Sequence, residues 1–153
     1  MTKFKVKTKI NAPQQIVFDI SRDIDVHQKS ASPTNEIAIA GVTSGLINLH
    51  ETVTWRGKHF GFYLTHKSRI TAMNLYDYFV DEMEEGKFKS FKHEHFFSHE
   101  NGVTVMKDKI LYETPFGFFG KLFDFLLLKR HMTNFVLARN KVLKGLAEKK
   151  IDA

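Results

Sequence analysis

The stretch that decides the fold runs from Val103 to Leu146, VTVMKDKILYETPFGFFGKLFDFLLLKRHMTNFVLARNKVLKGL, because its periodicity changes at Pro115. Up to Glu113, apolar and polar residues alternate with the period of two that is typical of a half-buried strand. Beyond Pro115, apolar residues recur at spacings of three, four or seven, at Leu122, Phe125, Leu128, Met132, Val136, Leu143 and Leu146. This pattern predicts one long amphipathic helix that closes the chain.

Upstream of this switch, the sequence stays extended from Ile37 onwards. The strand-like segments are Ile37–Val42, Gly45–Arg56, Lys58–Ile70, Tyr76–Glu84, Phe88–Ser98 and Val103–Glu113. Turn-forming residues separate them at Gly57, Asn74, Glu85-Gly86 and Asn101-Gly102. Short strands at such spacing predict an antiparallel meander.

The first 35 residues predict one more strand and one or two short helices. Lysines at positions 3, 5, 7 and 9 alternate with apolar residues, so one face of this strand is expected to be exposed to solvent. Asn11 followed by Pro13 predicts a helix start, with Asn11 as the N-cap and Pro13 in the first turn. Residues 22–35 predict another helical turn or two that run into a loop.

Composition limits the possible classes of protein. The chain has 153 residues, no cysteine, 15 phenylalanines and a net charge of +6. It suits a single domain over residues 1–153, and the lack of cysteine excludes disulfides, thiolate nucleophiles and thiolate metal sites. The lysine-rich N-terminal segment is unlike a signal sequence, so we expect a cytoplasmic protein.

These elements together predict an α+β fold. A sheet with one apolar face and a single long amphipathic helix bury their apolar surfaces best when the sheet curls around the helix. We expect a curved antiparallel sheet of about six to seven strands, with short helices after the first strand. A strongly curved sheet and one helix rarely fill the space between them, so an internal cavity is expected.

Four stretches carry a resemblance to a known superfamily: Glu51–Gly61 (ETVTWRGKHFG), Phe79–Met83 (FVDEM), Phe91–Phe96 (FKHEHF) and Pro115–Gly117 (PFG). With the element order, they resemble the SRPBCC superfamily, which includes START-domain, Bet v 1-like and polyketide cyclase or dehydrase-like proteins. The resemblance covers nearly the whole chain and is strongest to small bacterial members. It implies a helix-grip fold whose cavity, between sheet and C-terminal helix, usually holds an apolar or amphipathic small molecule.

Strand alternation predicts which side chains line this cavity. The expected lining is mainly apolar, with a minority of polar groups, which is the usual make-up of a small-molecule pocket. Arg139 falls within the apolar stripe of the last helix, where it either pairs with the carboxylate of Asp81 or Asp108 or binds an acidic group of the ligand. For the strand after Gly57, alternation leaves the inner face open. The predicted ligand-binding residues are Trp55, Phe79, Asp81, Met83, Phe91, His93, His95, Phe97, Met106, Asp108, Tyr112 and Arg139.

His93 and His95 admit three interpretations. Two residues apart on one strand, they point the same way, about 6 to 7 Å apart, so both imidazoles can reach one metal if His59, Asp81 or Asp108 completes the site. Alternatively, Asp81 or Asp108 orients one histidine for acid–base catalysis of a cyclase, aromatase or dehydratase type. We favour the simplest case, cavity-wall histidines hydrogen-bonded to carboxylates, and predict no metal and no cofactor.

The basic charge and the Phe116–Leu128 run suggest other partners. The lysines form an outer strand row and a helix end rather than a basic patch with stacking aromatics, so we predict no nucleic-acid partner. The run is too short to span a bilayer and is more consistent with a buried segment. If exposed, it is a cavity lid, a dimer surface or a site of transient membrane contact, and we favour the lid.

The sequence therefore predicts a monomer or homodimer that binds a hydrophobic or amphipathic small molecule, such as a lipid, polyketide or aromatic compound. Two alternatives stay open. One is a cyclase, aromatase or dehydratase that uses His93 or His95 with Asp81 or Asp108. The other is a protein or membrane interaction module that uses the Phe116–Leu128 surface.

Overall fold

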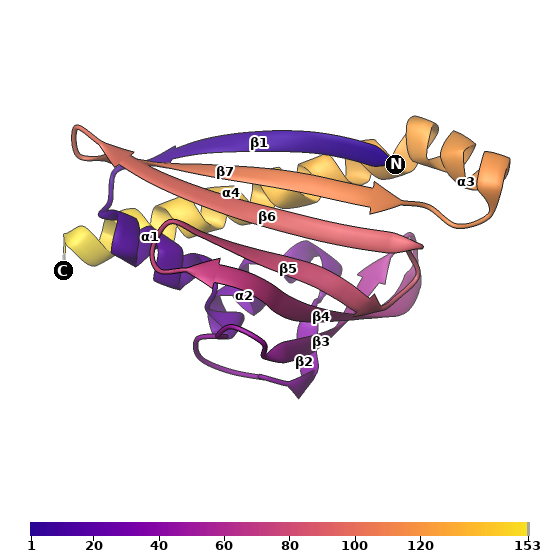
Figure 1. The fold of residues 1–153 in the computed structure, drawn as a ribbon, viewed down its shortest axis with the longest axis horizontal. Helices are drawn as coiled ribbons and strands as arrows, with labels where there is room; N and C mark the ends of the chain where they lie inside the picture. The colour runs from indigo at the N-terminus through magenta and orange to yellow at the C-terminus, as the bar shows by residue number, and fades with distance from the viewer. Residues whose placement is uncertain (153) are drawn as a thin grey trace.

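A computed structural model describes residues 1–152 and contains one seven-stranded antiparallel sheet with helices on one side (Figure 1). The strands are β1 (Thr2–Ile10), β2 (Ile37–Gly41), β3 (Thr52–His59), β4 (Phe62–Asn74), β5 (Tyr78–Glu85), β6 (Ser90–Glu100) and β7 (Val103–Glu113). Their order across the sheet is β1-β7-β6-β5-β4-β3-β2, so β2 to β7 form the expected meander and β1 pairs with its last strand.

The helices precede and follow the meander. They are α1 (Gln14–Ser21), α2 (Ile24–Ser30), the 3-10 turn η1 (Ser32–Thr34), α3 (Gly117–Phe123), the π-helical turn η2 (Asp124–Leu128) and α4 (Lys129–Ile151). The segments α3, η2 and α4 run on without a break, which confirms the long C-terminal helix. In Figure 1, α4 crosses behind the sheet, and it packs against β1, α1 and α2. The predicted α+β helix-grip fold is confirmed.

The two sheet edges are β1 and β2. The four β1 lysines are exposed, while Val6 and Ile10 on the same strand are buried. Exposed lysines on an edge strand oppose pairing with another chain. The basic outer row is thus explained by the place of β1 in the sheet. In the described part of the chain, no helix is both long and apolar enough to cross a membrane.

The predicted strand Lys58–Ile70 is wrong, because the chain reverses direction within it. Residues 52–59 and 62–74 form the β3–β4 hairpin, and Phe60 and Gly61 make the turn with positive φ angles of 51° and 83°. Gly57 lies inside β3 rather than at a turn. A Cβ atom there would lie 3.2 Å from Cγ of Glu36, so the glycine gives room to that side chain.

The predicted cap of the first helix is also wrong. Helix α1 begins at Gln14, with Pro13 at the N-cap position and no side-chain cap. The backbone N–H of Asn11 instead donates to the Glu148 carboxylate near the end of α4, at 3.0 Å. Asn11 therefore joins the first loop to the last helix. The next helix is capped conventionally, since the Asp23 side chain accepts from the backbone N–H groups of Asp25 and Val26.

Two hydrophobic clusters fill the space between sheet and helices. The larger one surrounds Phe18 of α1, whose ring makes edge contacts with Tyr76, Phe79 and Phe97 at 5.1 to 5.4 Å between centroids. The smaller one joins Val6, Ile110, Tyr112, Leu128 and Val136 beside the start of α4. Members of both clusters line one cavity, so the core is divided rather than continuous.

Gly120 and Gly145 provide a matched pair of tests for the C-terminal helix. A Cβ atom at Gly120 would lie 1.8 Å from the carbonyl oxygen of Pro115, whereas one at Gly145 would meet no atom within 4 Å. We expect Gly120→Ala to destabilise the protein by about 1–3 kcal/mol, as overpacking does. Gly145→Ala should stabilise it by up to about 1 kcal/mol, because alanine favours the helix. Urea unfolding measures both, and equal effects would contradict the close packing at Gly120.

Candidate functional site

The sheet and the C-terminal helix enclose a cavity of about 520 Å³, which is within the size range of small-molecule sites. Its wall is mainly apolar and includes Val53, Trp55, Ile70, Phe79 and Phe91. Six of the eight histidines in the chain also line it: His27, His59, His66, His93, His95 and His131. The cavity therefore combines an apolar surface with an unusual concentration of imidazole side chains.

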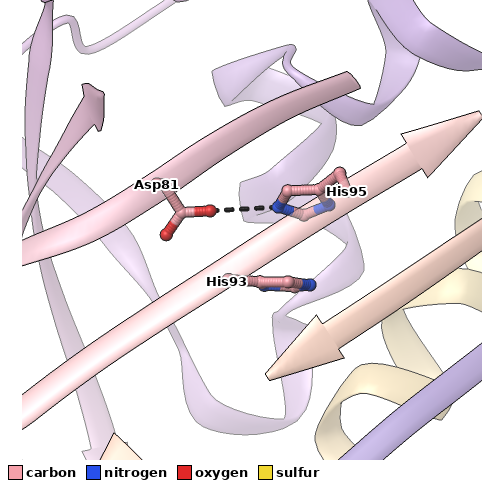
Figure 2. A group of neighbouring side chains, drawn as sticks. All are labelled: Asp81, His93 and His95. Atoms are coloured by element: carbon pink, nitrogen blue, oxygen red, sulfur yellow. Dashed lines mark hydrogen bonds and ion pairs between the residues drawn. The ribbon is translucent and has the colours of Figure 1, made fainter. Parts of the chain in front are cut away.

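Asp81, His93 and His95 form a polar group on the sheet wall of the cavity (Figure 2). Asp81 lies on β5 opposite His93 of β6, and period-two alternation places His95 on the same side of β6. Nε2 of His95 lies 3.0 Å from Oδ2 of Asp81. The two imidazoles stack with centroids 3.7 Å apart, and Phe79 covers the His95 ring at 4.1 Å. This register fixes all three polar side chains at one place.

Asp108 of β7 lies fully buried behind these histidines. Nε2 of His93 donates to its Oδ1 atom at 2.7 Å, and the Asn140 amide donates to its Oδ2 atom at 2.6 Å. Nδ1 of His95 approaches Oδ1 at 3.1 Å, although its orientation does not make a hydrogen bond. Nη1 of Arg139 lies 4.0 Å from the same oxygen. Asp108 is therefore the carboxylate nearest to Arg139, as one of the two sequence alternatives expected.

The stacked histidines have pKa values shifted in opposite directions. Burial lowers the pKa of His93, and the neighbouring His95 charge lowers it further, despite the Asp108 carboxylate. Burial also opposes protonation of His95, but Asp108 and Asp81 outweigh it and raise the His95 pKa. Burial opposes ionisation of Asp81 and Asp108, yet the histidine contacts lower both carboxyl pKa values. The two carboxylates thus favour the protonated form of His95, and Asp108 also faces the Arg139 guanidinium.

Asp81, His93 and His95 are also close enough to be considered as metal ligands. One ligand atom from each lies within 4.8 Å of the others, so Asp81 supplies the third ligand that the sequence left open. However, Nε2 of His93 and Nε2 of His95 each face a different carboxylate, and the rings stack instead of converging. Metal ligation through these two Nε2 atoms requires both hydrogen bonds to break. The arrangement fits a hydrogen-bonded acid–base network better.

A second polar group in the cavity was missed by sequence reasoning. Nε2 of His27 on α2 lies 2.6 Å from Oε2 of Glu36, and Nε2 of His59 on β3 lies 3.8 Å from Oε1. Nδ1 of His59 is 3.0 Å from Nε2 of His131 on α4. Burial opposes ionisation of Glu36, but hydrogen bonding to His27 and His59 lowers its pKa strongly. These residues are far apart in sequence, so only the high histidine count hinted at them.

The structure places seven of the predicted ligand-binding residues in the cavity wall and five outside it. Those in the wall are Trp55, Phe79, Asp81, Phe91, His93, His95 and Arg139. Phe97 packs against Phe18, Met106 is fully buried near the Ser21 hydroxyl, and Asp108 lies behind the histidines. Tyr112 donates its hydroxyl hydrogen to Asp124, and Met83 lies against Gly86. Alternation identified the inner face but not the depth of each side chain.

The strand face that alternation left open is now defined. Leu64, His66, Ser68 and Ile70 of β4 line the cavity, while Phe62 and Tyr63 are exposed. The hairpin turn is the reason, because it pairs odd-numbered residues of β3 with even-numbered residues of β4 on the same face of the sheet. On β3, odd positions such as Val53 and Trp55 face inward, and on β4 even positions do.

The Phe116–Leu128 run lies beside the cavity opening, and the expectation that it is a buried segment is wrong. Phe116, Phe118, Phe119 and Phe125 are among the most exposed side chains of the protein. Phe116, Phe119, Gly120, Phe123 and Leu128 also contribute to the cavity wall. A position at the cavity opening is compatible with the predicted lid, dimer surface or membrane contact.

The opposite pKa shifts of His93 and His95 can be measured directly. In a 15N NMR titration of the imidazoles, we expect His93 to titrate below and His95 above the ordinary value of about 6.5. Protonated His95 stabilises the folded protein fully at pH values below the pKa that His95 has in the unfolded chain. This stabilisation is lost as the pH rises through the His95 pKa in the folded protein. Asp108→Asn should lower the His95 pKa. Indistinguishable titrations of the two rings in the unsubstituted protein would contradict the network.

Comparisons with known proteins agree on the fold. No protein-family model matches the sequence, and no curated protein matches it. Among solved structures, TTHA0849 from Thermus thermophilus is similar with a TM-score of 0.74 and 18% identity, over 94% of this chain and 95% of that one. A START superfamily protein from Mycobacterium smegmatis has a TM-score of 0.72 and 11% identity, over 96% and 97% of the two chains.

A plant protein has the same architecture. Ginseng major latex-like protein 151 from Panax ginseng is similar with a TM-score of 0.66 and 16% identity, over 95% of this chain and 97% of that one. At these identities the comparisons establish the fold alone. The chain therefore has the helix-grip fold of START and Bet v 1-like proteins, as the sequence resemblance to the SRPBCC superfamily implied.

Proposed function

We propose that the protein binds a hydrophobic or amphipathic small molecule of lipid, polyketide or aromatic type in its internal cavity. The observation that carries this proposal is a cavity of about 520 Å³ whose apolar wall contains convergent polar groups. Burial of an apolar ligand surface supplies the main driving force, and the polar groups fix its orientation.

The polar end of the ligand lies against the Asp81, His93 and His95 group. Asp81 is partly accessible and lines the cavity, so its second oxygen can accept a hydrogen bond from a ligand hydroxyl. Phe79 and Phe91 flank this group and provide ring surfaces for an aromatic or aliphatic body. This arrangement favours ligands with one hydrogen-bonding end and an apolar remainder.

Trp55 offers a direct test because it is the only tryptophan and lines the cavity. We expect 6-bromo-2-naphthol, an amphipathic heavy-atom quencher, to quench Trp55 fluorescence saturably and to form a one-to-one adduct in native mass spectrometry. Ser68→Phe places a ring in the cavity and should weaken binding at least about tenfold, which corresponds to about 1.4 kcal/mol.

The matched control for this test is Ser98→Phe, since Ser98 is exposed on β6 and does not line the cavity. This variant should bind the naphthol as the unsubstituted protein does. Urea unfolding of both variants separates a blocked cavity from a damaged fold. Wild-type affinity in a folded Ser68→Phe variant would contradict binding in this cavity.

A second function is acid–base catalysis of the cyclase, aromatase or dehydratase type. One observation favours it: two adjacent histidines have pKa values moved apart by their surroundings, which is the pattern of paired acid and base groups. In this scheme neutral His93 takes a proton from a carbon next to a carbonyl group. The positive charge of protonated His95, held in place by Asp81, stabilises the oxygen that develops negative charge.

Enolisation of 2-tetralone tests this second function without knowledge of the natural substrate. In deuterated water, NMR should show the protein accelerating deuterium exchange at the carbons next to the carbonyl group. His93→Gln should reduce the catalysed rate about 100-fold, which is the lower end of general acid–base contributions. His99→Gln on the exposed end of β6 is the control. Exchange at the buffer rate would favour simple ligand binding.

A further inference from the structure

The C-terminal helix begins with an exposed apolar surface that the proposed ligand-binding function does not explain. Phe118 is 72% exposed and Phe125 is 83% exposed, which is far from the burial expected of phenylalanine. We call this the mouth surface. It consists of Phe116, Phe118, Phe119, Leu122, Phe123, Phe125, Leu126 and Leu127, together with Phe60 and Phe62 of the β3–β4 hairpin.

The two parts of the mouth surface meet although they are about sixty residues apart in the chain. The Phe60 ring lies 5.3 Å from the Phe123 ring and 4.5 Å from the His131 ring, between centroids. In Figure 1, α3 stands at one end of the molecule, near the N-terminus and far from the C-terminus. Apolar surface from two elements is thus concentrated at one end, and contiguous surface of this kind marks an interaction site.

The mouth surface is held in place by a buried anchor. Asp124, in the middle of the run, is buried and accepts hydrogen bonds from the hydroxyl groups of Tyr112 and Thr2. These contacts tie the π-helical turn η2 to β7 and β1. The turn leaves three consecutive apolar residues, Phe125, Leu126 and Leu127, exposed. The exposed rings therefore belong to a fixed segment rather than to a frayed helix end.

The exposed charges on the helical part of the mouth surface are positive, and Glu113, which precedes it, lies near Lys121. Lys121, Lys129 and Arg130 are exposed on the helical part, whereas Arg56 and Lys58 of β3 lie over Tyr63 on the outer face of the sheet. From residue 116 to residue 131 the only acidic side chain is Asp124, which is buried, and residues 52–66 contain none. An apolar face bordered by lysine and arginine is the composition of a surface that binds anionic lipid.

We propose that the mouth surface docks onto an anionic lipid bilayer. The phenylalanine and leucine side chains enter the boundary between headgroups and acyl chains, and the basic side chains contact the lipid phosphates. Phenylalanine suits this position because it has no polar group to leave unsatisfied. Docking is reversible, since it depends on side chains of one short segment and one hairpin rather than on a membrane-spanning helix.

A second copy of this chain fits the mouth surface less well. In a two-fold dimer the same surface meets itself, so Lys121, Lys129 and Arg130 would face or approach their own copies. Like charges brought together at an interface cost free energy, whereas anionic headgroups neutralise them. The charge pattern therefore selects the bilayer over self-association.

Docking goes beyond the proposed ligand binding and does not require the cavity to be occupied. The two features nevertheless share side chains, because Phe60, Phe119 and Phe123 belong to the mouth surface and also line the cavity. A docked protein presents the cavity opening to the membrane. An apolar ligand then moves between bilayer and cavity with less exposure to water.

Vesicle flotation with the full chain tests the proposal. We expect the protein to float with phosphatidylcholine vesicles that contain about 30% phosphatidylglycerol, to bind pure phosphatidylcholine more weakly, and to dissociate as salt rises. Phe118→Ser combined with Phe125→Ser should lower the partition coefficient at least about tenfold, because two exposed rings lose their transfer into lipid. Phe96→Ser, at an exposed phenylalanine on β6, should leave it unchanged.

A pair of charge variants separates local contact from net charge. Lys129→Glu with Arg130→Glu and Lys5→Glu with Lys7→Glu change the net charge equally, and all four residues are exposed. We expect the first pair to lower binding to anionic vesicles about tenfold or more and the second pair to have a much smaller effect. Equal effects of the two pairs would overturn the proposed surface.

Self-association would also overturn the proposal. In that outcome, sedimentation velocity shows a dimer, and the Phe118→Ser, Phe125→Ser double substitution dissociates it. The unsubstituted protein then does not float with vesicles. The double variant keeps the cavity wall intact, because neither residue lines it. Quenching of Trp55 by 6-bromo-2-naphthol in this variant therefore reports on ligand binding separately from docking.

Discussion

The buried Asp108 carboxylate is the constraint on which the site depends. A fully buried charge is tolerated only when it is paired and hydrogen-bonded. His93 of β6 and Asn140 of α4 donate to Asp108 of β7, and the Arg139 guanidinium approaches the same carboxylate. Arg139 also donates to the backbone oxygen of Ser21 in α1. One buried charge thereby fixes sheet, long helix and short helix relative to one another.

This network also explains how polar groups are accommodated in a mainly apolar cavity wall. His95 lies between the Asp81 and Asp108 carboxylates, and Phe79 covers its ring. Low local polarity strengthens each of these electrostatic contacts. Stacked His93 and His95 cannot both be protonated without repulsion, and the network moves their pKa values apart, that of His93 down and that of His95 up. The same geometry suits both proposed functions, orienting a ligand and moving a proton.

Much of the fold could be predicted because it depends on local patterns. The Val103–Glu113 strand has the predicted bounds, and the switch at Pro115 marks the start of the last helix. The predictions of turns and helix caps were wrong where a residue type has two possible structural roles. Gly57 looked like a turn but makes room for Glu36, and Asn11 looked like a cap but contacts Glu148. Such reasons concern residues distant in sequence, which no local pattern contains.

The sequence by itself determined a curved antiparallel sheet closed by one long helix and the inward direction of Asp81, His93 and His95, because periodicities of two and 3.6 assign faces without knowledge of the partner. Only the tertiary structure decided which inward side chains reach the cavity. It also brought His27, Glu36, His59 and His131 together and left the Phe116–Leu128 run exposed. These features depend on sheet curvature and on where the helix lies, which are set by the packing of the whole chain.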